Sequence, residues 1–322
     1  MAKYQTARTG KKVITRKDVG KYISLLTDFG FKRVFGTKEL MLKFLNTILD
    51  IEGGILDLQY GNPEKVGIIK TERKAIFDLY CITGNNEHII VEIQCASQVF
   101  FKDRSIFYAS RMINSLSKKG KDWNYELPRI FSINILDFTF EEALIPLGIK
   151  IQRKDKNKYF SIVQLIDRDT GDLFYDKLTL VYIELPCFTK ELEEVKTIFE
   201  QWIFIIKNLH KLEDLPKKFS KNKIFKLLFE IAKVAKMTTE EYNKYLKDLD
   251  DMNLVKNEIR TLQNFISERD NVITQKDITI AQKDITIIQH INTIAQKDNA
   301  LAAMEKEVEE LRRQLGLKTQ KV

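Results

Sequence analysis

The chain has few of the residues from which redox and zinc sites are built. Its 322 residues include three cysteines and three histidines. The cysteines lack C-x-x-C spacing and stand in apolar, strand-like segments, so a disulfide framework or a zinc site is not expected. The histidines are far apart in sequence, and no pattern supports a histidine metal cluster or a catalytic triad. Chemistry based on cysteine or histidine is therefore disfavoured.

Long apolar runs and nucleotide-binding loops are also missing. No run of about 18 apolar residues occurs, so no membrane partner is expected. The first residues show no apolar segment after their charges, which argues against a secretory signal and for a cytoplasmic location. No glycine-rich Walker loop precedes a Lys-Ser or Lys-Thr pair, and this disfavours ATP-driven chemistry.

The residues that are present indicate a globular, basic protein. Hydrophobic residues make up 44% of the chain, enough for a substantial core in one large or two ordinary domains. The formal net charge is +8. Residues 1–20 form a basic tail that we expect to be flexible, and such a tail favours a polyanion such as nucleic acid. The alternative is that surface lysines only keep the protein in solution.

Apolar periodicity predicts an α/β domain. Residues 22–50 have helical spacing, typical of a helix pair or one interrupted helix. Residues 98–116 predict another helix, whose apolar residues, Ile106 and Phe107 among them, would pack on a sheet. Runs rich in β-branched residues predict strands at residues 55–60, 67–69, 76–81, 89–94, 129–136, 159–166 and 178–185. A mixed sheet of roughly five or six strands is expected.

Helices follow this sheet. Residues 189–210 and 223–236 have helical spacing, and Thr238 with Glu241 predicts a capping box that opens a further helix. Beyond it an apolar residue occurs at every seventh position: Ile259, Ile266, Ile273, Ile280, Ile287, Ile294, Leu301, Val308 and Leu315. This repeat predicts a long helix and a left-handed coiled coil. A coiled-coil seam needs a second row of apolar residues, but the positions three residues after four of these isoleucines are polar: Lys276, Lys283, His290 and Lys297. Self-association and a single solvated helix therefore remain alternatives.

Two carboxylates stand on the predicted hairpin formed by residues 76–81 and 89–94. Strand alternation puts Glu92 and Gln94 on one face, and Asp78 can face them across the hairpin. Carboxylates among apolar residues are costly unless they bind a cation or are paired. The pattern predicts a divalent metal site; the alternatives are pairing with Lys74 or an exposed hairpin face.

Taken with two flanking segments, this hairpin resembles the PD-(D/E)XK nuclease superfamily. The segments are Thr27-Asp28-Phe29-Gly30-Phe31-Lys32-Arg33-Val34-Phe35-Gly36 and Arg104-Ser105-Ile106-Phe107-Tyr108. As a set they are similar to the transposase-related branch, the recombination-promoting nucleases, over roughly residues 20–250. The resemblance implies a restriction-endonuclease-like core, that is, a mixed sheet flanked by helices, and an enzyme that hydrolyses DNA phosphodiester bonds with low sequence specificity.

The resemblance also implies roles for single residues. Asp78, Glu92 and the backbone carbonyl of Ile93 would bind Mg²⁺, with Mn²⁺ as a substitute. Gln94 stands where the superfamily has lysine; an amide can orient a water but cannot titrate, and as an alternative it is a plain strand residue. In related nucleases a helix acid at the position of Asp28 adds a ligand through water, whereas the alternative for Thr27 or Asp28 is a helix N-cap.

Basic and aromatic residues supply candidate DNA contacts. Lys32 and Lys74 are candidates for the missing positive charge. Arg104, Tyr108 and Arg111 share one helical face, which suits phosphate contacts or closure over the site, the alternative being surface solvation.

The sequence thus predicts a nuclease core at residues 21–188, a helical extension packed on it at 189–250 and a repeat helix at 251–322 that forms a homo-oligomer. The predicted function is a Mg²⁺-dependent DNA endonuclease. The alternatives are a catalytically inactive DNA-binding scaffold, if Gln94 has removed turnover, and a nuclease that cuts RNA.

Overall fold

The computed structural model describes residues 19–62, 78–117, 123–149, 151 and 153–316. It divides into two compact units, one ending at Arg260 and the other beginning at Thr261. Lys74, the predicted strand at residues 67–69 and nearly all of the basic tail lie outside the described residues. None of the helices in the described ranges is long and apolar enough to cross a membrane.

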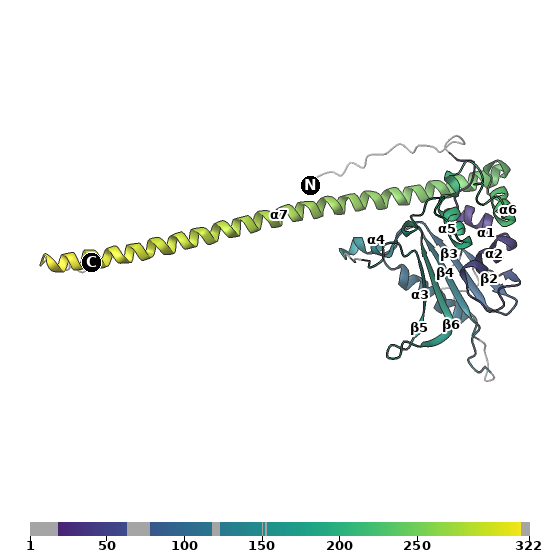
Figure 1. Cartoon of the computed structure of the whole chain (residues 1–322), viewed down its shortest axis with the longest axis horizontal. Coiled ribbons are helices and arrows are strands. Elements are labelled where there is room, and N and C mark those ends of the chain that lie inside the picture. Colours follow the sequence, from purple (N-terminus) through teal and green to yellow (C-terminus); the bar gives the residue numbers. More distant parts are fainter. Residues whose placement is uncertain (1–18, 63–77, 118–122, 150, 152, 317–322) are drawn as a thin grey trace, which may run out of the picture. The chain divides into compact units, whose positions relative to one another are not determined.

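A mixed sheet of six strands forms the centre of the first unit (Figure 1). The strands are β1 (Leu58–Tyr60), β2 (Leu79–Thr83), β3 (His88–Gln94), β4 (Ile130–Leu136), β5 (Phe160–Ile166) and β6 (Leu173–Glu184). Their order is β1-β2-β3-β4-β6-β5, with β3, β4 and β6 parallel and the other neighbours antiparallel. The predicted mixed sheet is confirmed. β6 begins earlier than predicted because its first residues pair with β5, Leu173 opposite Ile166.

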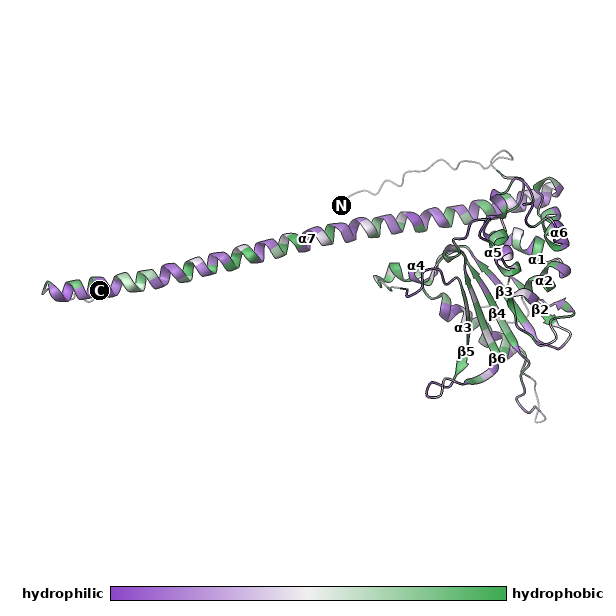
Figure 2. Ribbon diagram, viewed as in Figure 1, coloured by the Kyte–Doolittle hydropathy of each residue, from purple (hydrophilic) through white to green (hydrophobic). Residues whose placement is uncertain are grey.

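Helices cover both faces of this sheet. They are α1 (Asp28–Phe35), α2 (Lys38–Ile48), α3 (Phe101–Ser115), α4 (Phe140–Leu144), α5 (Ile198–Asn208) and α6 (Lys223–Ile231), with single 3₁₀ turns at Ile145–Leu147, Leu185–Cys187, Leu209–Lys211 and Val234–Lys236. α1, α2, α5 and α6 share one core with Val91 and the other odd-numbered residues of β3. On the other face Met112 of α3 packs on Ile90 and Ile130. Figure 2 shows the apolar strands between these helices.

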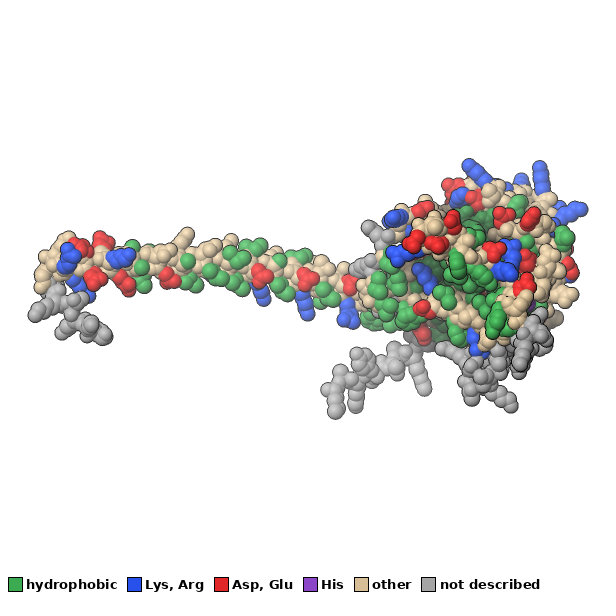
Figure 3. Space-filling model, turned by 90° about the horizontal axis from the view of Figure 1, so that it is seen from below, with side chains coloured by type: hydrophobic (Ala, Val, Ile, Leu, Met, Phe, Trp, Pro, Cys, Tyr) green, Lys and Arg blue, Asp and Glu red, His purple; other side chains and the backbone are tan. Residues whose placement is uncertain are grey.

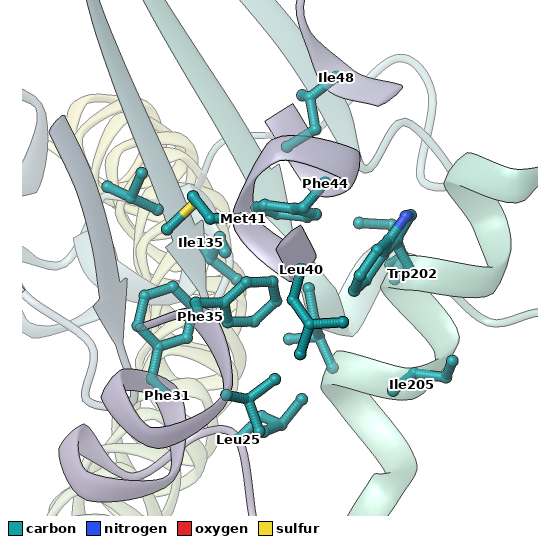
Figure 4. Close-up of a cluster of buried hydrophobic side chains, with 14 of the residues drawn as sticks. Leu25, Phe31, Phe35, Leu40, Met41, Phe44, Ile48, Ile135, Trp202 and Ile205 are labelled. Atoms are coloured by element: carbon teal, nitrogen blue, oxygen red, sulfur yellow. The ribbon is translucent and has the colours of Figure 1, made fainter. Parts of the chain in front are cut away.

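Aromatic side chains join the first two helices to α5. Trp202 is buried, and its ring centroid lies 5.4 Å from that of Phe44 and 5.9 Å from that of Phe35. Figure 4 shows these rings in one cluster with Phe31, and with Ile135 of the sheet. The α5 and α6 helices therefore complete the core that covers the sheet.

Helix boundaries differ from the prediction where caps decide them. The helix expected at residues 189–210 begins only at Ile198, because Thr197 and Glu200 form a capping box there. The helix expected at 223–236 ends at Ile231. The short α4 was not predicted, and it too begins with a capping box, formed by Thr139 and Glu142. The box at Thr238 and Glu241 is confirmed.

The predicted long helix is α7 (Thr239–Gln314). Its first part, up to residue 260, packs on the core: the Tyr245 hydroxyl accepts a hydrogen bond from the Ser24 backbone N–H (2.8 Å). In the second unit, apolar and polar residues alternate along the helix (Figure 2). Its large apolar side chains from Leu262 to Leu315 are mostly exposed, by 46% to 72%.

Candidate metal centre

Asp78 and Glu92 lie side by side where β2 meets the end of β3. The antiparallel register places Leu79 opposite Val91, which brings Asp78, just before β2, next to Glu92. The Asp78 backbone N–H donates to Glu92 Oε1 (3.1 Å), and the Ile93 backbone N–H donates to Asp78 Oδ2 (2.6 Å). The two carboxylates are therefore held together by the backbone of the strands that carry them.

Glu92 is removed from water, and Asp78 is partly buried. Glu92 is 2% exposed. Burial raises the pKa of both carboxyl groups above their ordinary values, and the charge of Asp78 raises the pKa of Glu92 further. Two buried carboxylates so close together favour either a shared proton or a bound cation.

Gln94 belongs to a polar network that leads from Glu92 to α3. Its Nε2 donates to Glu92 Oε2 (3.4 Å), and its Oε1 accepts from Gln98 Nε2 (3.0 Å). Arg104 Nη1 donates to Gln98 Oε1 (2.9 Å) and to Gln94 Oε1 (3.4 Å), and Arg104 Nη2 lies 3.7 Å from Glu92 Oε2. The network fixes the Gln94 amide and brings a guanidinium beside Glu92.

Sequence reasoning missed Gln98 in this network. The only signal is that Gln98 and Gln94 are four residues apart. A pair of amides at that spacing is common in sequences. It indicates a network only once Arg104 is known to donate hydrogen bonds to both side chains.

Helix α1 brings a second cation to the carboxylates. Lys32 Nζ pairs with Asp28 Oδ1 (2.6 Å), and its charge lowers the pKa of Asp78 and of Glu92. Asp28 acts in the opposite sense and raises the pKa of Asp78. The N-cap of α1 is Thr27, whose hydroxyl accepts a hydrogen bond from the Gly30 backbone N–H (3.1 Å). Asp28 is therefore not the N-cap, and its carboxylate pairs with Lys32.

The remaining candidates lie at different depths. The Arg104 guanidinium stands 5.0 Å from the centroid of the Tyr108 ring, so both belong to the surroundings of the site. Arg111 is only 9% exposed, and a phosphate on the surface would not reach it directly in this structure. Lys74 lies outside the described residues.

The donor set suits a hard divalent cation. Such ions prefer carboxylate and carbonyl oxygens and water, and Asp78 and Glu92 offer carboxylate oxygens on a shared strand edge. Within the described ranges no group of three or more His, Cys, Asp and Glu side chains gathers at one point. A cation held here would therefore draw further ligands from backbone carbonyls and water.

A mixed six-stranded sheet flanked by helices, with an acidic pair at the end of β3, defines a PD-(D/E)XK-like α/β fold. The chain belongs to the PD-(D/E)XK nuclease family transposases: the sequence model of that family matches residues 25–261, most of the chain. The match spans the helix pair, the acidic hairpin and α3, and it confirms the resemblance found in the sequence. Neither the curated proteins nor the solved structures that were searched gave a match.

Proposed function

We propose that the chain is a Mg²⁺-dependent DNA endonuclease in which Asp78, Glu92 and the Ile93 backbone carbonyl hold the cation, with Mn²⁺ as a substitute. The observation that carries this proposal is the buried pair of carboxylates at the end of β3, inside the region that matches a nuclease family. The backbone fixes their geometry, Lys32 and Arg104 offset part of their mutual repulsion, and a bound cation or a shared proton would relieve the rest.

The chain's own residues prepare the site for phosphodiester hydrolysis. A bound cation supplies a more acidic water and neutralises charge on the phosphate. Gln94 is held by Gln98 and Arg104 and orients the attacking water, although its amide cannot take up a proton. Lys32 and Arg104 supply the positive charge that a lysine at position 94 would have given.

DNA contacts follow from the same residues. Arg104 lies beside Glu92, Tyr108 lies beside Arg104, and the charge of Lys32 acts on both carboxylates; the net charge of +8 favours a polyanion. Every DNA sequence has the same backbone phosphates, and every base has a flat aromatic face. Contacts to these groups do not distinguish one sequence from another, so low sequence specificity is expected.

The test is cleavage of supercoiled plasmid by the full-length protein with Mg²⁺, Mn²⁺, Ca²⁺ or EDTA. The proposal predicts nicked or linear DNA with Mg²⁺ and Mn²⁺ and intact plasmid with EDTA. If the protein shifts DNA in a gel but leaves it uncut with every cation, Gln94 has removed turnover and the chain is a DNA-binding scaffold. If a matched RNA is cut and DNA is not, the substrate is RNA.

We further propose that two chains pair in parallel through the last part of α7. Apolar residues occupy both rows of the heptad here: Leu301, Met304, Val308, Leu311 and Leu315, all exposed in the single chain. Figure 3 shows exposed apolar side chains at intervals along the second unit. Val308 in the first row and Leu311 in the second favour a two-stranded coiled coil.

Charge sets the direction of this pairing. With Leu301 in the first position of the heptad, Glu307 precedes a core residue and Arg312 follows one. In a parallel dimer Glu307 of one chain lies beside Arg312 of the other, whereas an antiparallel dimer would bring the two Glu307 side chains together. The upstream heptads place lysine in the second row, so the last fifteen residues or so of the helix carry most of the pairing.

A further inference from the structure

An open pocket adjoins the carboxylates along the first half of α3. Its volume is about 750 Å³, and the residues that matter for its chemistry are Gln98, Phe100, Asp103, Arg104, Phe107 and Tyr108. Two of these residues, Gln98 and Arg104, also belong to the hydrogen-bonded network around Gln94 and Glu92. The pocket and the proposed metal centre are therefore parts of one surface.

The pocket presents aromatic rings to solvent. Phe100 is 66% exposed and Phe107 is 42% exposed, and the Phe107 and Tyr108 rings lie 6.3 Å apart. Single exposed apolar residues are ordinary on protein surfaces. Three aromatic side chains within nine residues, around one depression and next to an arginine, indicate a binding site for a flat, partly apolar group.

Charge decides what that group is. Arg104 and Asp103 line the pocket with opposite charges, so it does not select an anion such as phosphate. A nucleobase is neutral, stacks on aromatic rings and accepts hydrogen bonds from a guanidinium. Phosphate is better accommodated beside the pocket, where Arg104 lies next to Glu92 and the charge of Lys32 acts on both carboxylates.

We propose that this pocket takes an unstacked nucleobase from the nucleotide next to the scissile phosphate. The inference rests on the proposed nuclease function, because it assigns the substrate's phosphate to the Asp78 and Glu92 pair. A base inside a duplex has both faces covered by its neighbours and cannot stack on protein until it leaves the helix. The preferred substrate is thus DNA with unpaired nucleotides: single strands, frayed ends or junctions.

Fluorescence of 2-aminopurine tests this directly. A single-stranded oligonucleotide carrying the analogue, and the same oligonucleotide in a duplex, are titrated with full-length protein in Ca²⁺. Phe100→Leu and Phe107→Leu are compared with Phe174→Leu, which removes an even more exposed ring (76%) from β6, outside the pocket. Leucine keeps the apolar volume but cannot stack, and thermal melting checks that each variant folds.

The wild type and Phe174→Leu should change the fluorescence of the single strand and bind it more tightly than the duplex. Phe107→Leu and Phe100→Leu should weaken single-strand binding by about 5- to 100-fold and leave duplex binding unchanged. Equal single-strand binding by all four proteins would overturn the proposal. So would a Phe107→Leu protein that changes only its self-association, which would make the pocket a protein contact.

The readout is independent of turnover. Stacking without plasmid cleavage in Mg²⁺ would leave the base pocket standing and remove the nuclease function. Plasmid cleavage without a stacking signal would support the nuclease function and refute the base pocket.

Discussion

At the scale of one residue, the buried carboxylate of Glu92 lowers the stability of the metal-free protein but is suited to binding a cation. Its carboxylate is buried against Asp78 and pairs only at 3.7 Å with a cationic side chain, Arg104. Burial and the charge of Asp78 raise its pKa to about 8 from an ordinary 4.5. A group with this shift costs the metal-free protein stability at neutral pH, which is expected of a residue kept for binding a cation.

The sign of the pH effect follows from proton binding. Between its ordinary pKa and about 8, Glu92 holds more proton in the folded protein than in the unfolded chain, so its contribution to stability falls as pH rises through this window. Below the ordinary value both states are protonated and the effect vanishes. Glu92→Gln keeps the acceptor for the Asp78 N–H and removes the titration.

In EDTA at pH 8 we therefore expect Glu92→Gln to melt above the wild type, by about 2–4 °C for each kcal/mol gained. The difference should shrink by pH 5, and Mg²⁺ should raise the Tm of the wild type and of the control variant but not that of Glu92→Gln. Glu87→Gln, just before the same strand and also buried, serves as the control. A variant less stable than the wild type at pH 8 would show that the carboxylate stabilises the apo fold.

At the scale of elements, α1 places a lysine where the strand lacks one. Lys32 acts on both carboxylates from the helix, held by its pairing with Asp28. Lys32→Met should lower the single-turnover cleavage rate by about 100-fold, because a positive charge near the developing phosphate charge is removed. Lys38→Met is the control, since Lys38, at the start of α2, pairs with Asp57 and not with a residue of the site. Equal rates for the two variants would refute the role of Lys32.

The packing of α5 on the helix pair holds α1 in that position. Trp202→Ala should cost about 3–5 kcal/mol in the free energy of unfolding, because a buried ring in contact with Phe35 and Phe44 is lost. Ile198→Ala, at an exposed position (47%) of the same helix, should change it by less than about 0.5 kcal/mol. Chemical denaturation measures both, and similar losses would contradict this account of the core.

The sequence predicted elements better than it predicted their environment. Strand alternation suffices to put Glu92 and Gln94 on one face and Val91 on the other, because the period of a strand is set by the backbone. Periodicity alone put Ile106 and Phe107 against the sheet, and this was wrong: they are 59% and 42% exposed. A helix pattern shows that an apolar stripe exists, but tertiary packing decides which part of it is covered.

In the candidate site, too, local features could be predicted from the sequence and tertiary contacts could not. The acidic pair is local to one hairpin and could be predicted from strand alternation. Lys32 was one of two candidates for the missing charge, but its place near the pair could not be predicted, because α1 and the hairpin are brought together by packing between segments distant in the chain. The start of α5 was predicted too early because residues 189–197 also have helical apolar spacing. The capping box of Thr197 and Glu200 begins the helix after them.

At the scale of the whole molecule, the proposed pairing through the end of α7 would place two nuclease-family units in one assembly. Val308→Glu introduces a charge into the proposed apolar seam and should convert the protein to a monomer, measured as mass by light scattering. Lys306→Glu alters charge on the face opposite the seam and should leave the dimer intact. A wild-type protein that is already monomeric at micromolar concentration would refute the proposed dimer.

The most direct test of the central claim is the single-turnover rate of DNA cleavage by Glu92→Gln in Mg²⁺, beside Glu87→Gln and the wild type. The account predicts a loss of at least about 1,000-fold for Glu92→Gln, since a carboxylate ligand of the cation is gone, and a near wild-type rate for Glu87→Gln. Cleavage by Glu92→Gln at the wild-type rate would contradict it, and the phosphodiester chemistry would then belong elsewhere in the chain.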